Sequence, residues 1–145
     1  MKIIDTFVFS DDHKSNEGDL IIKIPCNIKT ENALFDVLLK GLSFPYFGWN
    51  WNALDDCLHD FEWLRAKKII IQHDDLPQMP VNELKIYLEV LSSAVYDWMN
   101  DSAHDFVVVF PVQEKAQIVS IVGEETVMSK FTDKPIGEEL RNPNK

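Results

Sequence analysis

The chain has few of the residues that carry redox, disulfide or nucleotide chemistry. Its 145 residues include two cysteines, Cys26 and Cys57, and five glycines. Two cysteines are too few for a disulfide framework, and neither belongs to a CxxC pair that could bind a metal or exchange a disulfide. No glycine-rich phosphate-binding loop is present, so a nucleotide-dependent enzyme is not expected. The sequence therefore predicts a protein without a cofactor.

Long apolar runs are also missing. The runs that occur are far shorter than the roughly 20 residues that cross a membrane. The apolar character after Lys2 is broken by Asp5, which does not fit a secretory signal peptide. We therefore expect a cytoplasmic protein that makes no contact with a membrane.

Basic residues are scarce relative to acidic ones. Lysine and arginine total 14, against 24 aspartates and glutamates, which gives a formal net charge of -10 at pH 7. A surface this negative repels phosphate backbones, so direct binding to nucleic acid is not expected. The same charge favours basic proteins as partners and speeds their encounter with this chain.

Short continuous apolar runs alternate with helical patterns along the chain. Such runs are typical of strands buried on both faces of a parallel sheet, and the alternation indicates an α/β fold. The sequence thus predicts a small parallel three-stranded sheet flanked by helices, in a single domain over residues 1–132. Strands are predicted over 20–25, 68–72 and 106–110, and helices over 31–40, from Asn50 or Asn52 onward, and from Pro80 or Val81 onward.

Three further segments are predicted outside these elements. Residues 3–10 have the pattern of another strand, and residues 117–122 that of an added edge strand. Gly41 is predicted to stop the helix over 31–40. Residues 133–145 are polar and contain two prolines, which is typical of a flexible tail.

Five aromatic residues and a glycine stand within residues 44–51, directly before a short helix. Large rings in a loop are costly to expose unless something covers them, and aromatic rings are common anchors of protein interfaces. The rings are those of Phe44, Tyr46, Phe47, Trp49 and Trp51.

The helix that follows carries acid on one face. Between Asn50 and Trp63 there are four carboxylates and no lysine or arginine. Asn52, Asp56 and His59 stand at i, i+4 and i+7, which predicts one stripe opposite the apolar face. Rings beside an acidic helix predict a docking surface for a basic protein rather than a catalytic pocket. The carboxylates are those of Asp55, Asp56, Asp60 and Glu62, and the apolar positions are Ala53, Leu54, Cys57, Leu58 and Phe61.

This segment resembles the signature of the barstar family, intracellular inhibitors of secreted ribonucleases. In that family an aromatic pair and a glycine lead through an asparagine into a helix with the pattern Asp-Ala-Leu-x-Asp-Cys-Leu. Here residues 46–48, Asn50 and residues 52–58 match it. The resemblance implies a three-stranded parallel sheet with flanking helices and an immunity-type inhibitor of a basic nuclease or toxin, such as a ribonuclease. It also implies a monomer in a 1:1 complex, and it leaves residues 1–18 and those beyond Pro111 unexplained.

The resemblance also implies which residues contact the partner. Asp56 stands where the family keeps its principal acid, which enters the ribonuclease's phosphate-binding pocket and meets its arginines and catalytic histidine. A further acid on the helix before the last strand takes part in the family, and Asp97 is the nearest candidate. Asn52 replaces an acid that is common in the family, and Asp55 stands where a tryptophan is common. The predicted partner-binding set is Tyr46, Phe47, Gly48, Asn50, Trp51, Asn52, Asp55, Asp56, His59 and Asp97.

Two other classes of function compete with an inhibitor. A metal-dependent hydrolase is one, because His73, Asp74 and Asp75 follow a predicted strand, where ligands often sit in parallel sheets. Adjacent loop residues seldom point at one ion, and no histidine pair has the spacing of a metal-binding helix, so no metal and no catalytic residues are predicted. Asp56 with His59 could form an acid–base pair, but no serine or cysteine motif accompanies it. The other class is a general acidic interaction module with a partner that is not a nuclease.

Overall fold

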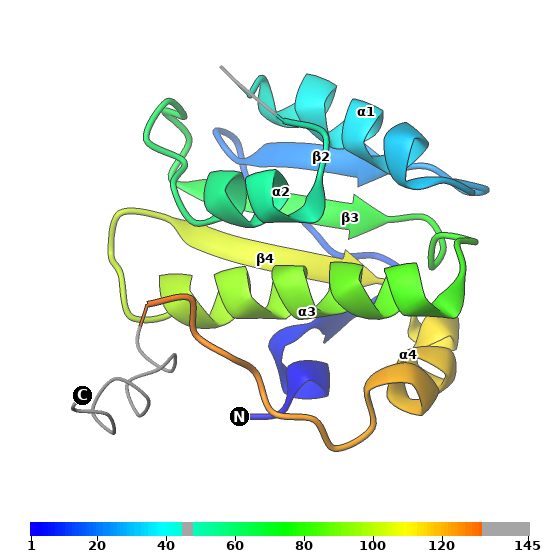
Figure 1. Cartoon of the computed structure of the whole chain (residues 1–145). Coiled ribbons are helices and arrows are strands. Elements are labelled where there is room, and N and C mark those ends of the chain that lie inside the picture. Colours follow the sequence, from blue (N-terminus) through cyan, green and yellow to red (C-terminus); the bar gives the residue numbers. More distant parts are fainter. Residues whose placement is uncertain (45–47, 132–145) are drawn as a thin grey trace.

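The computed structural model describes residues 1–44 and 48–131 and contains a sheet of four parallel strands (Figure 1). The order across the sheet is β1 (Val8–Phe9), β4 (Asp105–Phe110), β3 (Lys68–His73) and β2 (Leu20–Ile24), and each pair of neighbours is parallel. The three longer strands confirm the predicted α/β fold. The prediction of three strands is corrected to four, because the short β1 adds to the free edge of β4.

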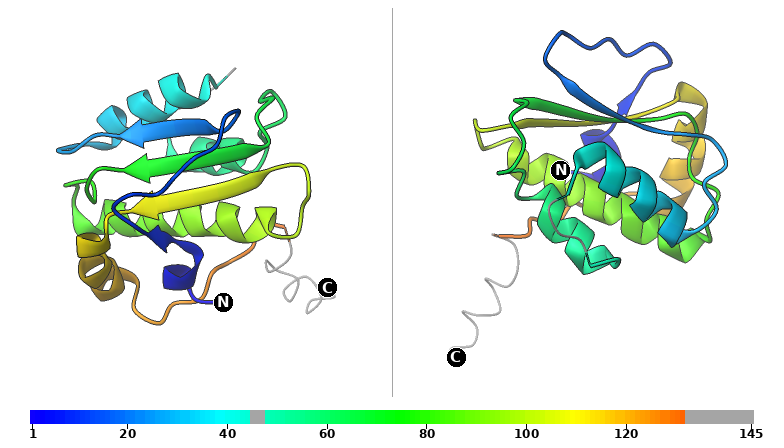
Figure 2. Two further views of the ribbon diagram at one scale, coloured as in Figure 1. Left: turned by 180° about the vertical axis from the view of Figure 1, so that it is seen from behind. Right: turned by 90° about the horizontal axis from the view of Figure 1, so that it is seen from above.

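Helices α1 (Glu31–Leu42), α2 (Trp51–Leu58) and α3 (Val81–Trp98) lie on one face of the sheet (Figure 2). The segment between β1 and β2 runs across the opposite face in both views of that figure. Ile70 and Val109 are also buried, although neither belongs to the cluster that Ile69, Ile71 and Val108 form with the helices. Both faces of the central strands are therefore covered, as their continuous apolar runs predicted.

Two predictions near the chain ends are wrong. Residues 3–10 do not form one strand, because Ile3–Thr6 is a short 3-10 helix (η1) that precedes β1. Residues 117–122 belong to a helix, α4 (Lys115–Val122), which follows a 3-10 turn, η2 (Val112–Glu114). The β-branched residues of this segment favoured a strand, but Ile118 and Val122 are buried one helical turn apart, and that spacing suits a helix that packs against its neighbours.

Gly41 does not stop α1, which continues to Leu42. A Cβ atom on Gly41 would lie 2.7 Å from Ile22 Cγ2, so the missing side chain lets the helix approach β2 closely. The helix ends instead at Leu42, and the C-cap is Ser43, which adopts a left-handed conformation with a φ of 52°.

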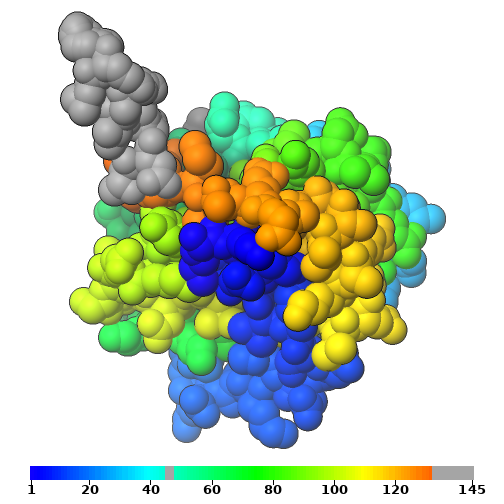
Figure 3. Space-filling model, turned by 90° about the horizontal axis from the view of Figure 1, so that it is seen from below, coloured from blue at the N-terminus to red at the C-terminus, as the bar shows by residue number. Residues whose placement is uncertain are grey.

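The segment that follows α4, residues 124–131, is called the strap here. Its backbone pairs with the N-terminal residues: Ile3 N–H donates to Glu125 O at 2.9 Å, and Val127 N–H donates to Met1 O at 2.9 Å. Figure 3 shows the strap beside these residues on one side of the molecule. The predicted tail, residues 133–145, lies outside the described residues. Within residues 1–44 and 48–131, no helix has the length and apolar character needed to cross a bilayer.

Candidate functional site

The start of α2 is fixed by the residues that the sequence singled out. The Asn50 side chain accepts a hydrogen bond from Ala53 N–H at 2.8 Å, so Asn50, of the two candidate caps, is the N-cap. The Trp51 Nε1–H group donates to Glu31 Oε2 at 2.6 Å, and its ring meets the Phe35 ring edge-on at 5.0 Å. Trp51 is half-buried, and these two contacts join the start of α2 to α1.

Among the described residues before α2, Trp49 has an exposed aromatic ring, and it was not in the predicted set. Its side chain is 47% exposed, and its ring lies 6.3 Å from that of Phe35. Its place in the aromatic loop is the signal that could have identified it. Tyr46 and Phe47, which were predicted to bind the partner, lie outside the described residues.

The outer face of α2 displays Asp56, whose side chain is 70% exposed. It borders a hollow of about 620 Å³ beside the helix. Several carboxylates line this hollow. Burial of the Cys57 thiol is the larger cause that raises its pKa to about 11, and the negative charges of Asp56 and Asp60 add to it. The thiol is therefore a poor nucleophile. The hollow is lined by Gly48, Asn50, Asn52, Ala53, Asp56, Cys57, Asp60, Glu62 and Trp63.

His59 does not belong to the exposed stripe predicted for it. Its side chain is 2% exposed, with Nδ1 2.7 Å from Asp55 O and Nε2 3.0 Å from Asp97 Oδ2. The physical reason is that α2 ends at Leu58, so His59 is the C-cap and its ring turns inward. A buried ring cannot touch a partner directly in this conformation, and its contacts join the end of α2 to α3.

Asp97 also faces inward, toward the strap. Its side chain is 12% exposed, and it accepts hydrogen bonds from Ser129 Oγ at 2.6 Å and from Lys130 N–H at 2.8 Å. In this conformation the carboxylate predicted to contact the partner is occupied by the strap.

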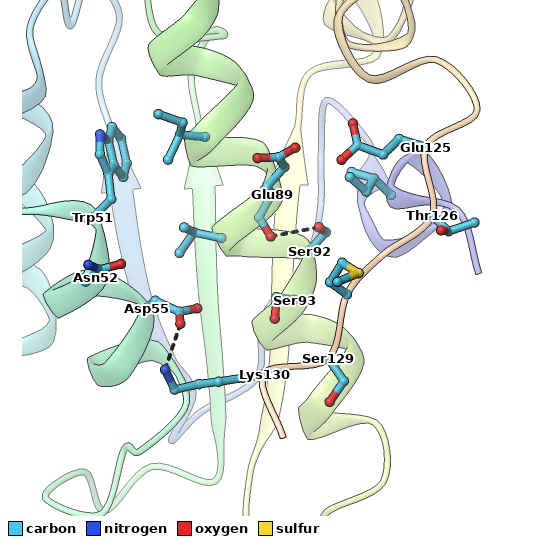
Figure 4. A pocket seen from close by; sticks show the side chains of 14 residues that line it. Trp51, Asn52, Asp55, Glu89, Ser92, Ser93, Glu125, Thr126, Ser129 and Lys130 are labelled. Carbon is cyan, nitrogen blue, oxygen red and sulfur yellow. Dashed lines mark hydrogen bonds and ion pairs between the residues drawn. The ribbon is translucent and has the colours of Figure 1, made fainter. Parts of the chain in front are cut away.

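The acidic face of α2 was expected to have no basic residue beside it, but Lys130 of the strap lies against it. Its Nζ atom lies 2.9 Å from Asp55 Oδ2 (Figure 4) and 2.7 Å from Asp56 Oδ1. Burial lowers the pKa of Lys130, but the hydrogen bonds and charges of Asp56 and Asp55 outweigh this effect and raise it. Sequence reasoning missed this residue because Lys130 and Asp55 are 75 positions apart.

A second hollow, of about 370 Å³, lies over α3 between α2 and the strap (Figure 4). Glu89 of α3 and Glu125 of the strap face one another across it. Burial, followed by the hydrogen bond and the charge of Glu125, raises the pKa of Glu89 to about 7, although Lys85 acts in the opposite direction. The Glu89 carboxyl group therefore keeps its proton at a higher pH than an ordinary glutamate does.

Replacing Glu89 with glutamine is expected to reduce the loss of thermal stability between pH 5 and pH 8. The folded protein keeps the Glu89 proton up to about pH 7, whereas the unfolded chain releases it near the ordinary value of 4.5. The folded state thus binds more protons in this window, and its stability falls as pH rises. Melting curves at both pH values would measure the effect. Glu124→Gln, an exposed neighbour in the strap, is the control, and equal pH dependence in the two variants would refute the raised pKa of Glu89.

The structure argues against a metal site at the loop after β3. His73 is buried, with Nδ1 2.9 Å from Val109 O and Nε2 2.7 Å from the Tyr87 hydroxyl. Burial lowers the pKa of His73 to about 4, although the bond to Val109 acts in the opposite direction. Both ring nitrogens are used inside the core, so His73 cannot join Asp75 around an ion. No cluster of three potential metal ligands occurs in the part of the chain that the structure describes.

Comparison with known proteins agrees with the resemblance seen in the sequence. A family model described as Barstar (barnase inhibitor) matches residues 25–111, more than half of the chain. The match supports a role in ribonuclease inhibition or immunity in general. It leaves out η1, β1, β2, α4 and the strap. A comparison with curated proteins gave no match.

Proposed function

Because the chain belongs to the Barstar (barnase inhibitor) family, we propose that it is an immunity protein that inhibits a basic nuclease. The proposed target is a ribonuclease toxin, held in a 1:1 complex with its active site covered by α2 and the loop before it. Such an inhibitor acts in the cytoplasm of the cell that makes the toxin.

The exposed carboxylate of Asp56 on a capped helix is the observation that carries this proposal. A ribonuclease binds the phosphates of its substrate with basic side chains, and a carboxylate held on a rigid element can occupy the same place. Arginine forks bind carboxylates through paired hydrogen bonds, which gives such a contact both strength and direction. The net charge of -10 attracts a basic target from a distance.

The surroundings of Asp56 fit a protein partner better than a small ligand. The hollow beside α2 carries further acids, Asp60 and Glu62, and Trp49 offers an exposed ring nearby in the sequence. Aromatic anchors within a polar rim are typical of protein interfaces, and a specific complex buries on the order of 1,600 Å² in total.

We expect the immobilised protein to capture a basic protein with ribonuclease activity from cells that make both. The eluted ribonuclease should lose its activity when one molar equivalent of the purified inhibitor is added back, because the active site is covered. Cleavage of a fluorogenic RNA during this titration measures the stoichiometry.

The Asp56→Ala variant, immobilised in the same way, is the control that tests whether capture uses this face of α2. A captured protein that keeps full ribonuclease activity in the complex would contradict the covered active site. A captured partner without nuclease activity would favour a general interaction module instead.

A further inference from the structure

The strap places a positive charge on the surface that we propose for the partner. The Lys130 Nζ atom is within hydrogen-bond distance of one oxygen of Asp55 (Figure 4) and of one oxygen of Asp56. Two carboxylates on α2 thus share one ammonium group that belongs to the same chain. The strap lies beyond residue 111, outside the part of the chain that the family model matches.

The strap is held by contacts that do not involve this ammonium group. Ser129 Oγ–H and the Lys130 backbone N–H both donate to Asp97, at 2.6 and 2.8 Å. Phe131 meets the His59 ring edge-on, with the centroids 5.5 Å apart. The backbone is therefore anchored independently, and the Lys130 side chain can leave the acids without release of the strap.

The ion pairs of Lys130 are open to exchange. The side chains of Asp56 and Lys130 are 70% and 30% exposed, so water and other cations reach the pair. Ion pairs at such exposure are weak, because the charges remain partly hydrated. An arginine can bind a carboxylate through two parallel hydrogen bonds, whereas an ammonium group is a single point charge.

We propose that Lys130 is an internal competitor that a partner's guanidinium group displaces from Asp56. The proposal rests on the proposed function in so far as it takes the face of α2 as the binding surface. While Lys130 occupies Asp56, only part of the population is ready to bind, and the apparent affinity for a cationic partner falls by that fraction. This cost is the same for every partner that uses Asp56, so weakly binding basic proteins are the first to lose occupancy.

An acetylated and amidated tetra-arginine peptide tests this competition without a nuclease. The peptide is titrated at low salt, and its affinity is read from the amide chemical shift of Asp56. Lys130→Met keeps the apolar stem and the backbone bond to Asp97 but removes the charge, so it should bind the peptide roughly three- to tenfold more tightly than the unaltered protein. Lys130→Arg should bind it more weakly, because a guanidinium competes better than an ammonium group.

Lys40→Met is the matched control, since it removes the same charge from another exposed ion pair, with Asp36 on α1. Equal gains in Lys130→Met and Lys40→Met would mean that net charge alone acts, and would overturn the proposal. Failure of the peptide to shift the Asp56 amide in every variant would overturn it as well. Neither result depends on ribonuclease inhibition, and a failure of that inhibition would leave the peptide result standing.

Discussion

Replacing Asp56 with alanine is expected to weaken binding of the captured partner by roughly 2–5 kcal/mol, mostly through faster dissociation. The loss is this large because the partner's arginines, desolvated in the complex, would be left without a carboxylate. Loss of the Lys130 contact in the free protein contributes little, since Asp55 still pairs with the same ammonium group. Surface binding kinetics with the captured ribonuclease would measure both rate constants.

Asp60→Ala is the matched control for Asp56→Ala. Asp60 follows the end of α2 and is exposed, and it borders the same hollow, so both variants lose one negative charge from one region. At physiological salt an exposed pair contributes about 0–1 kcal/mol, so Asp60→Ala should change mainly the association rate. Equal losses at the two positions would mean that general charge attracts the partner, and the insertion of Asp56 into an active site would be wrong.

The central part of the fold could be predicted because its strands are uniform in character. Continuous apolar runs identified β2, β3 and β4, since strands covered on both faces need no polar alternation. The same reasoning failed for α4, where β-branched residues favoured a strand and the helical spacing of Ile118 and Val122 was decisive. It also failed at Gly41, whose role is a close approach to Ile22 that the local sequence does not reveal.

The site could be predicted only where it is local in sequence. The N-cap at Asn50 and the exposed Asp56 follow from residues within a few positions of each other. The inward turn of His59, by contrast, depends on Asp97 of α3, and the neutralising charge comes from Lys130. Such contacts join distant segments, and no periodicity within one helix contains them.

Phe61 lies beyond the end of the helix in whose apolar face it was predicted, but it is buried as that face predicted. It follows the apolar spacing of α2, yet α2 ends at Leu58 and Phe61 adopts a φ of 54° in the turn beyond it. Its side chain is nevertheless fully buried, stacked on Trp98 with the ring centroids 5.5 Å apart and edge-on to Phe106 at 5.3 Å. The ring therefore joins the exit of α2 to both α3 and β4.

Replacing Phe61 with alanine is expected to lower the free energy of unfolding by about 3–5 kcal/mol, because the loss of a buried ring removes its transfer free energy and leaves a cavity. Alanine keeps a Cβ atom at the same positive φ, so the backbone strain stays and the difference reports the ring alone. Urea denaturation of both proteins measures it, provided that the slope with denaturant is unchanged. Phe131→Ala, at a side chain that is 65% exposed, makes the same chemical change at the surface and should cost far less. Similar losses in the two variants would mean that the Phe61 ring does not hold α2 to the core, and the rigid presentation of Asp56 would then lack its support.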